Sequence, residues 1–96
     1  MMRLLIAEDD EVLRRELSRD LESHGYETAV PERFEDVEDI VKEGKVHLVL
    51  LDVTLPGRDG YEICRSIRRF SRIPILFLTS RDTDMDELYG MTMGGD

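Results

Sequence analysis

The sequence predicts an α/β fold in which a doubly wound parallel sheet carries helices on both faces. Short apolar runs alternate with amphipathic stretches in the order strand, helix, four times along the chain. The runs Leu4–Ala7, Val46–Leu51 and Ile73–Leu78 are nearly continuous, as expected for strands covered on both faces. Right-handed crossovers would join such strands, and 96 residues allow a single domain spanning 1–96.

The first strand and helix are predicted from the N-terminal segment. Leu4–Ala7 forms the apolar run, and Gly25 stands where the following helix would end. The helix is predicted from residues that recur at helical spacing, namely Val12, Leu13, Leu17 and Leu21. Glu8-Asp9-Asp10 lies between the two elements, so Asp9 or Asp10 is also a natural N-cap for this helix.

The second strand and helix carry a weaker pattern. Residues 26–30 alternate in polarity through Tyr26, Thr28 and Val30, which favours a strand at the sheet edge. Pro31 is suited to the start of a helix, and Gly44 to its end. Phe34, Val37 and Val41 would share the buried face of that helix.

The third strand, Val46–Leu51, is the strongest in the sequence and ends at Asp52. Residues 53–60 contain proline and glycine and are predicted to form a loop. Asp59 and Glu62 have the spacing of a capping box for a third helix. The side chains predicted to face inward from that helix are Ile63, Cys64 and Ile67.

The last predicted elements are a strand and a helix. Ile73–Leu78 forms the fourth strand, with Pro74 at its start, where a proline is tolerated. A fourth helix is predicted over residues 82–93 from the spacing of Met85, Leu88 and Thr92.

Composition excludes several classes of function. The formal net charge of −9 comes from 22 acidic and 13 basic residues, so direct contact with nucleic acid is not expected. Apolar runs fall far short of the roughly 18 residues that span a bilayer, and the N-terminus does not resemble a secretory signal. The single Cys64 excludes an internal disulfide, which favours a reducing, cytoplasmic location.

Three strand ends carry groups suited to chemistry. Glu8 and Asp9 follow the first strand, Asp52 the third and Thr79 the fourth. Since sites in open parallel sheets form at the carboxyl ends of strands, these groups are predicted to converge. Clustered carboxylates repel unless one is protonated or a cation is bound, and oxygen ligands suit Mg²⁺. Alone, Thr79 could be an ordinary strand-end hydroxyl, but Asp52 is costly after an apolar run unless paired.

Three segments resemble, in order and spacing, the signature segments of bacterial two-component response-regulator receivers: residues 4–10, 50–60 and 74–80. The resemblance implies a flavodoxin-like receiver with strand order 2-1-3-4. It is most like receivers fused to winged-helix DNA-binding domains. It also implies a phosphoprotein of a phosphorelay that regulates transcription.

The resemblance also assigns roles to individual residues. Asp52 would be the phospho-acceptor, and Thr79 would hydrogen-bond the phosphoryl group and act as a switch. Mg²⁺ would be held by Glu8, Asp9, Asp52 and the backbone carbonyl of Thr54.

Further expectations concern partners and the end of the chain. A sensor histidine kinase would donate the phosphoryl group, and an output domain would lie outside this chain. Family members carry a fifth strand with a lysine, and a last helix, and both are expected to be missing here. The edge of Ile73–Leu78 would then be exposed, which predicts homodimerisation or strand exchange through it. Gly60 is expected to permit close backbone approach behind Asp52.

Two other functions remain open at this point. One is a Mg²⁺-dependent phosphohydrolase with an aspartyl nucleophile of the haloacid-dehalogenase type. That motif needs a second acid two residues after the nucleophile, where Thr54 stands, and it normally closes the first strand. The other is a receiver-like interaction module that never takes phosphate, against which the acids and Asp52 count. Of these three hypotheses we favour the receiver, and we expect such a domain not to be an enzyme.

Overall fold

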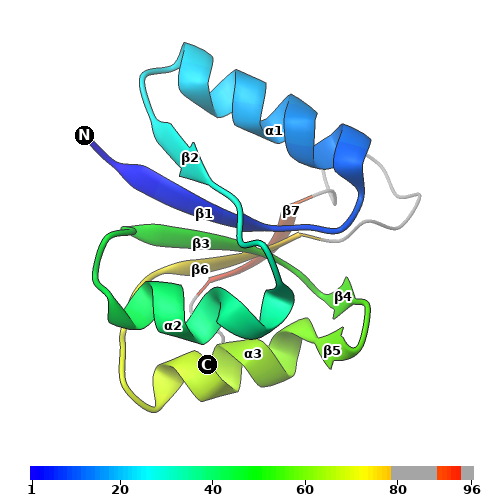
Figure 1. Cartoon of the computed structure of the whole chain (residues 1–96), viewed down its shortest axis with the longest axis vertical. Coiled ribbons are helices and arrows are strands. Elements are labelled where there is room, and N and C mark those ends of the chain that lie inside the picture. Colours follow the sequence, from blue (N-terminus) through cyan, green and yellow to red (C-terminus); the bar gives the residue numbers. More distant parts are fainter. Residues whose placement is uncertain (79–88, 94–96) are drawn as a thin grey trace.

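The computed structural model describes residues 1–78 and 89–93 as a sheet covered on both faces by helices. Helix α1 lies on one face, and α2 and α3 lie on the other (Figure 1). Within the described residues, no helix is both long and apolar enough to cross a membrane. The elements are β1 (Arg3–Ala7), α1 (Glu11–Ser23), β2 (Glu27–Ala29), the 3-10 turn η1 (Phe34–Asp36), α2 (Val37–Lys42), β3 (Leu48–Asp52), β4 (Thr54–Leu55), β5 (Arg58–Asp59), α3 (Gly60–Arg68), β6 (Ile75–Leu78) and β7 (Tyr89–Met93).

The sheet order is β2-β1-β3-β6-β7, and the first four strands are parallel. The predicted order of the first four strands is therefore confirmed. In the register of the sheet, Ala7 lies opposite Leu51, and Asp52 lies opposite Leu78. The strand ends that carry the acidic residues are consequently level with one another.

Two apolar layers hold the helices to the sheet. The larger layer lies under α2 and α3, and among its fully buried members are Leu5, Val49, Ile63 and Ile67. The smaller layer lies under α1, where Leu17 packs with buried strand residues. The central strands are thus covered by apolar layers on both faces, which is why the sequences of β1, β3 and β6 are nearly continuous apolar runs.

The second helix starts later than predicted. Arg33 is extended, with φ −136° and ψ 148°, and helical structure begins at Phe34 as a single 3-10 turn before α2. The expectation that Pro31 opens this helix is therefore wrong, because the extended residue separates the proline from the first turn. The predicted face is correct, since Val37 and Val41 are buried.

The predicted fourth helix is wrong over its last residues. Tyr89–Met93 forms β7, which pairs antiparallel with β6, while residues 79–88 lie outside the described part of the chain. The physical reason is non-local: pairing with β7 satisfies backbone groups along the edge of β6 that would otherwise face solvent. The edge expected to drive dimerisation is thus occupied by the same chain, so that argument for a dimer fails.

The predicted loop after β3 contains a small antiparallel hairpin, β4–β5, which turns at Gly57 with φ +76°. Behind it, the Gly60 N–H donates to the Val53 carbonyl at 2.7 Å. A Cβ built on Gly60 would overlap the Asp52 carbonyl oxygen and lie 2.9 Å from Cα of Val53. The expected close approach of backbone at Gly60 is therefore confirmed.

Gly60→Ala should destabilise the fold by about 1–3 kcal/mol, because the new methyl group must displace the backbone of Asp52. Urea unfolding measures this. Gly57→Ala is the matched control, since among the described residues nothing beyond its chain neighbours lies within 4 Å of its Cβ position, and its positive φ opposes alanine by about 1 kcal/mol. A Gly60→Ala variant as stable as wild type, or more stable than Gly57→Ala, would contradict the packing described here.

Candidate functional site

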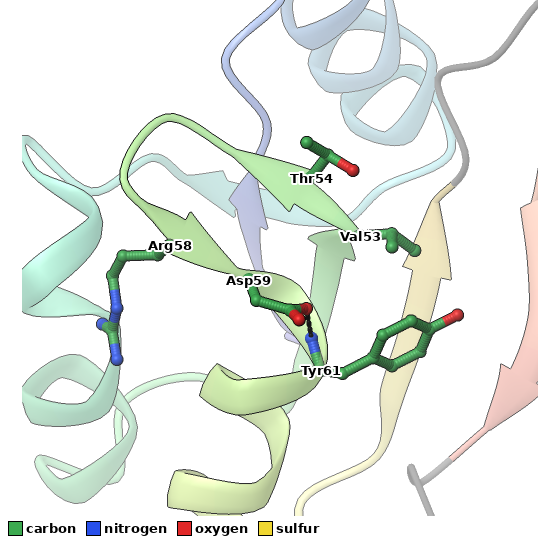
Figure 2. A pocket seen from close by; sticks show the side chains of 5 residues that line it. All are labelled: Val53, Thr54, Arg58, Asp59 and Tyr61. Carbon is green, nitrogen blue, oxygen red and sulfur yellow. Dashed lines mark hydrogen bonds between the residues drawn. The ribbon is translucent and has the colours of Figure 1, made fainter.

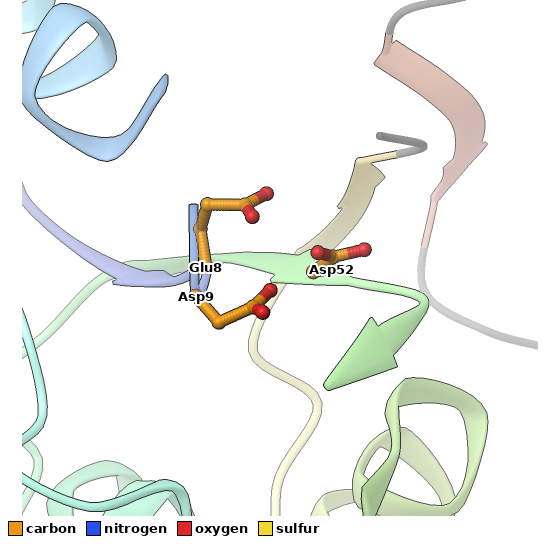
Figure 3. A group of neighbouring side chains, drawn as sticks. All are labelled: Glu8, Asp9 and Asp52. Carbon is orange, nitrogen blue, oxygen red and sulfur yellow. The ribbon is translucent and has the colours of Figure 1, made fainter. Parts of the chain in front are cut away.

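Three carboxyl groups meet at the carboxyl ends of β1 and β3. The register that pairs Ala7 with Leu51 places Glu8 beside Asp52, and Asp9 follows at the same edge. Figure 3 shows the three side chains directed toward a common point. One carboxylate oxygen from each lies within 4.8 Å of the others. The predicted convergence of these three residues is therefore found.

The acidic run after β1 is divided between capping and the site. Oδ1 of Asp10 accepts from the N–H groups of Val12 and Leu13 at 3.0 and 3.1 Å, so Asp10 is the N-cap of α1. The Asp10 N–H donates to Oε2 of Glu8 at 2.9 Å. Asp9 has an exposed side chain and belongs to the cluster instead. Of the two capping candidates, Asp10 takes that role.

Two of the three carboxyl groups are removed from water. Glu8 is 0% exposed and Asp52 is 1% exposed. Oδ1 of Asp52 accepts from the Thr54 N–H at 3.1 Å. Within the part of the chain that the structure describes, Oε1 of Glu8 and Oδ2 of Asp52 have no hydrogen-bond partner. Buried, unpartnered carboxylate oxygens are costly, which points to a ligand that would satisfy them.

Burial and mutual repulsion perturb the acidity of the pair. Burial raises the pKa of Glu8 to about 7, and the charges of Asp52 and Asp9 act in the same direction, against the Asp10 N–H. Burial likewise raises the pKa of Asp52, while the Thr54 N–H opposes the shift. Both carboxyls therefore hold protons more tightly than ordinary acids, as groups do where a cation is needed to balance charge.

The donor set suits a hard cation. Carboxylate oxygens from Glu8, Asp9 and Asp52 could hold Mg²⁺, and the unpartnered oxygens show that the cluster has capacity for it. Thr54 lies beside the cluster through its N–H bond to Asp52, and a ligand role for its carbonyl stays a prediction. Thr79 lies outside the described residues, so its role also stays a prediction.

A shallow hollow of about 360 Å³ lies next to the end of β3. Its lining comes from the β3 end, the hairpin and the start of α3 (Figure 2), namely Val53, Thr54, Arg58, Asp59 and Tyr61. Tyr61 packs against Phe77 with ring centroids 4.8 Å apart. Sequence reasoning missed Arg58 and Tyr61 here, since a charged residue in a turn and an aromatic near a helix start carry no local signal of a site.

Curated relatives share the whole length of the chain. The response regulator protein GraR of Staphylococcus haemolyticus is 42% identical over 95 residues, covering 99% of this chain and 42% of GraR. The transcriptional regulatory protein AfsQ1 of Streptomyces coelicolor is 41% identical over 96 residues, covering 100% of this chain and 43% of AfsQ1. The chain therefore spans about two fifths of the length of these relatives.

Solved structures show the same fold. The BeF3-activated receiver domain of Klebsiella pneumoniae RstA superposes with a TM-score of 0.75 at 36% identity, covering 88% of this chain and 72% of that one. TrrA of Thermotoga maritima with Mg²⁺-BeF gives 0.76 at 30%, covering 92% and 77%. TrrA in complex with the histidine kinase ThkA gives 0.75 at 31%, covering 88% and 77%.

The response regulator receiver domain family matches residues 4–96, almost the entire chain. The three segments that carried the resemblance, the parallel strand order and the acidic cluster all lie within that match. This chain belongs to the response regulator receiver domain family.

Proposed function

We propose that Asp52 accepts a phosphoryl group from a sensor histidine kinase in a Mg²⁺-dependent reaction. The observation that carries the proposal is the acidic cluster, in which one oxygen of the buried Asp52 has no hydrogen-bond partner among the described residues. The relationship to TrrA, solved with a histidine kinase, supports the choice of donor. A cytoplasmic location, which the lone Cys64 favours, would let such a kinase reach the site.

The geometry around Asp52 suits a nucleophile. The Thr54 N–H fixes Oδ1 at 3.1 Å, which leaves Oδ2 as the attacking oxygen. Attack on phosphohistidine forms an O–P bond and breaks the P–N bond, whose electron pair stays on the imidazole nitrogen and is protonated from solvent. Holding the carboxylate in one orientation contributes to the rate because it removes rotational freedom before the reaction.

The metal would be held by Glu8, Asp9 and Asp52, with the Thr54 carbonyl as a proposed further ligand. Mg²⁺ supplies neutralisation of the charge on the transferring phosphoryl group. Burial of Glu8 and Asp52 keeps their local dielectric low, which strengthens their attraction for a cation. The exposed Asp9 lies on the solvent side of the cluster.

The consequence of phosphorylation is proposed to be a switch. Thr79 would hydrogen-bond the phosphoryl group and bias a two-state surface, which an output domain would read. The name of AfsQ1 supports an output that regulates transcription. With a net charge of −9, this segment is not expected to contact DNA itself, so that role would belong to the output domain.

The two rival functions have less support. A haloacid-dehalogenase-type hydrolase would need an acid at position 54, where threonine stands, and its nucleophile on the first strand, whereas Asp52 ends β3. A module that never takes phosphate does not account for two buried carboxylate oxygens that lack hydrogen-bond partners within residues 1–78 and 89–93. We therefore propose a signalling receiver rather than a turnover enzyme.

Asp52→Asn should abolish phosphorylation, because an amide cannot attack the donor. The measurement is the intact mass of the chain after incubation with acetyl phosphate and Mg²⁺, where wild type should gain one phosphoryl group and lose that gain when EDTA is present. Asp59→Asn is the matched control, since asparagine also caps a helix and should still cap α3. A labelled Asp52→Asn variant, or repeated turnover of a small phosphate ester by wild type, would contradict the proposal.

Asp9→Asn should weaken Mg²⁺ binding by about tenfold or more, equivalent to 1.4 kcal/mol, because it removes a charged ligand from the cluster. Isothermal titration calorimetry measures the affinity. Asp10→Asn makes the same exchange one residue away and retains the cap of α1, so it should change the affinity far less. Equal losses in the two variants would show that only general charge matters.

Without Mg²⁺, stability should fall as pH rises from about 4.5 to about 7, since folded Glu8 keeps its proton up to a pKa of about 7 and the unfolded chain does not. The contribution of Glu8 to the free energy of unfolding is fully present below the pKa of Glu8 in the unfolded chain, about 4.5. It is lost as the pH rises through the pKa of Glu8 in the folded chain, and the loss amounts to at most about 3 kcal/mol. Urea unfolding in EDTA measures it. Glu8→Gln should lack this component, and saturating Mg²⁺ should reduce it in wild type. Parallel wild-type and Glu8→Gln profiles would contradict the assignment.

A further inference from the structure

The β4–β5 hairpin, residues 54–59, is too small to hold its own position. It has two residue pairs, Thr54 with Asp59 and Leu55 with Arg58. An isolated hairpin is marginal in water even when it is longer. Yet its first residue, Thr54, donates the hydrogen bond that orients Oδ1 of Asp52. Contacts outside the hairpin must therefore fix its position relative to the acceptor.

Arg58 supplies the largest set of such polar contacts. Its Nη1 and Nη2 atoms donate to the two carboxylate oxygens of Glu38 at 3.0 and 2.8 Å, and Nη1 also donates to the Phe34 carbonyl at 3.1 Å. Figure 2 shows the Arg58 side chain extending from the hairpin toward the neighbouring helical segment. A bidentate pair with a third bond fixes both distance and orientation.

This ion pair differs from the others in its burial. The side chains of Arg58 and Glu38 are 23% and 15% exposed, whereas those of Arg15 and Glu11 are 71% and 60% exposed. Burial alone would raise the pKa of Glu38, but the hydrogen bonds from Arg58 hold it below its ordinary value. Removing Arg58 would leave the mostly buried Glu38 carboxylate without that partner, which would weaken the contact between the hairpin and α2.

The pairing of β4 with β5 links the Arg58–Glu38 contact to Asp52. Arg58 lies opposite Leu55, which is 4% exposed in the core beneath α2 and α3. Thr54 directly precedes Leu55 and is paired with Asp59, the N-cap of α3. Arg58 binds the hairpin to α2 through Glu38, and Asp59 joins the hairpin to α3 as its N-cap. These two contacts hold the hairpin, and with it the segment from Asp52 to Thr54.

We propose that Arg58 is a positioning residue for the acceptor site: through Glu38 and the Phe34 carbonyl it holds the hairpin so that Thr54 orients Asp52, and this sets the affinity for Mg²⁺. The inference rests on the proposed function, because it concerns the same cation site. Arg58 itself contacts neither the acceptor nor the cluster in the interactions described.

A purely electrostatic role and a positioning role for Arg58 predict opposite changes in Mg²⁺ affinity when Arg58 is replaced. Removing a positive charge near an acidic site should strengthen Mg²⁺ binding if only electrostatics operate. If Arg58 positions the site, Arg58→Met should instead weaken binding by about tenfold, as loss of a supporting contact commonly does. The Mg²⁺ affinity of Arg58→Lys should fall between those of wild type and Arg58→Met, since lysine keeps the charge but not the bidentate geometry.

The experiment titrates Mg²⁺ into wild type, Arg58→Met, Arg58→Lys and Glu38→Gln by calorimetry. Arg33→Met is the matched control, because it removes a charge from a loose, exposed pair with Asp36 at 3.7 Å in the same region. Weaker binding in both Arg58→Met and Glu38→Gln, with no loss in Arg33→Met, is the expected result. The double variant Arg58→Met/Glu38→Gln should lose no more than Arg58→Met, since both act through one contact.

A second readout separates positioning from general destabilisation. In Mg²⁺-free buffer, amide hydrogen exchange at Thr54 should accelerate at least about tenfold in Arg58→Met, while exchange at Leu50 in the centre of β3 should stay near wild type. Mg²⁺ affinity in Arg58→Met that equals or exceeds wild type would overturn this inference alone. Equal acceleration at both amides would overturn it too, as a purely structural effect. If wild type binds no Mg²⁺, the proposed function and this inference both fail.

Discussion

The burial of two carboxyl groups side by side is the constraint on which the rest of this domain depends. Glu8 follows β1 and Asp52 ends β3, and the register of these adjacent parallel strands aligns Ala7 with Leu51, so the backbone places the two carboxyl groups side by side. Both are almost fully buried, and each keeps one oxygen without a partner in the described chain. The surrounding apolar strands supply the stability that makes this arrangement tolerable.

The supporting elements can be understood as ways of holding that pair in one geometry. Asp10 caps α1 and through its N–H holds Glu8, while Thr54 holds Asp52. Gly60 allows the start of α3 to pack directly on the backbone of Asp52 and Val53 at the end of β3. In each case a backbone group, not a flexible side chain, does the positioning, which limits the reorganisation needed when a cation or phosphoryl group arrives.

Much of this could be predicted from sequence because the signals are local. Continuous apolar runs identified β1, β3 and β6, and acids directly after two of them identified the site. Apart from the late start of the second helix, the misses are non-local. Residues 89–93 were assigned to a helix, but they pair with an open strand edge that no local pattern describes. Arg58 of the β4–β5 hairpin pairs with Glu38, and the two residues are twenty apart in sequence.

The acidic run Glu8-Asp9-Asp10 also shows what the sequence alone does not predict. Sequence alone could not choose between Asp9 and Asp10 as the cap of α1, because both residue types and positions are acceptable. The choice depends on where the backbone turns after β1, and that turn places Asp9 in the acidic cluster and Asp10 at the start of α1. A one-residue shift would exchange a member of the cluster for a helix cap.

We propose that Glu8, Asp9 and Asp52 together form one cation site. Crystals grown with Mn²⁺ in place of Mg²⁺ would locate the cation in an anomalous difference map. We expect one strong peak within coordination distance of carboxylate oxygens of Asp9 and Asp52, with Glu8 adjacent. A map with no peak at the ends of β1 and β3, or with its strongest peak on another acidic surface, would contradict it.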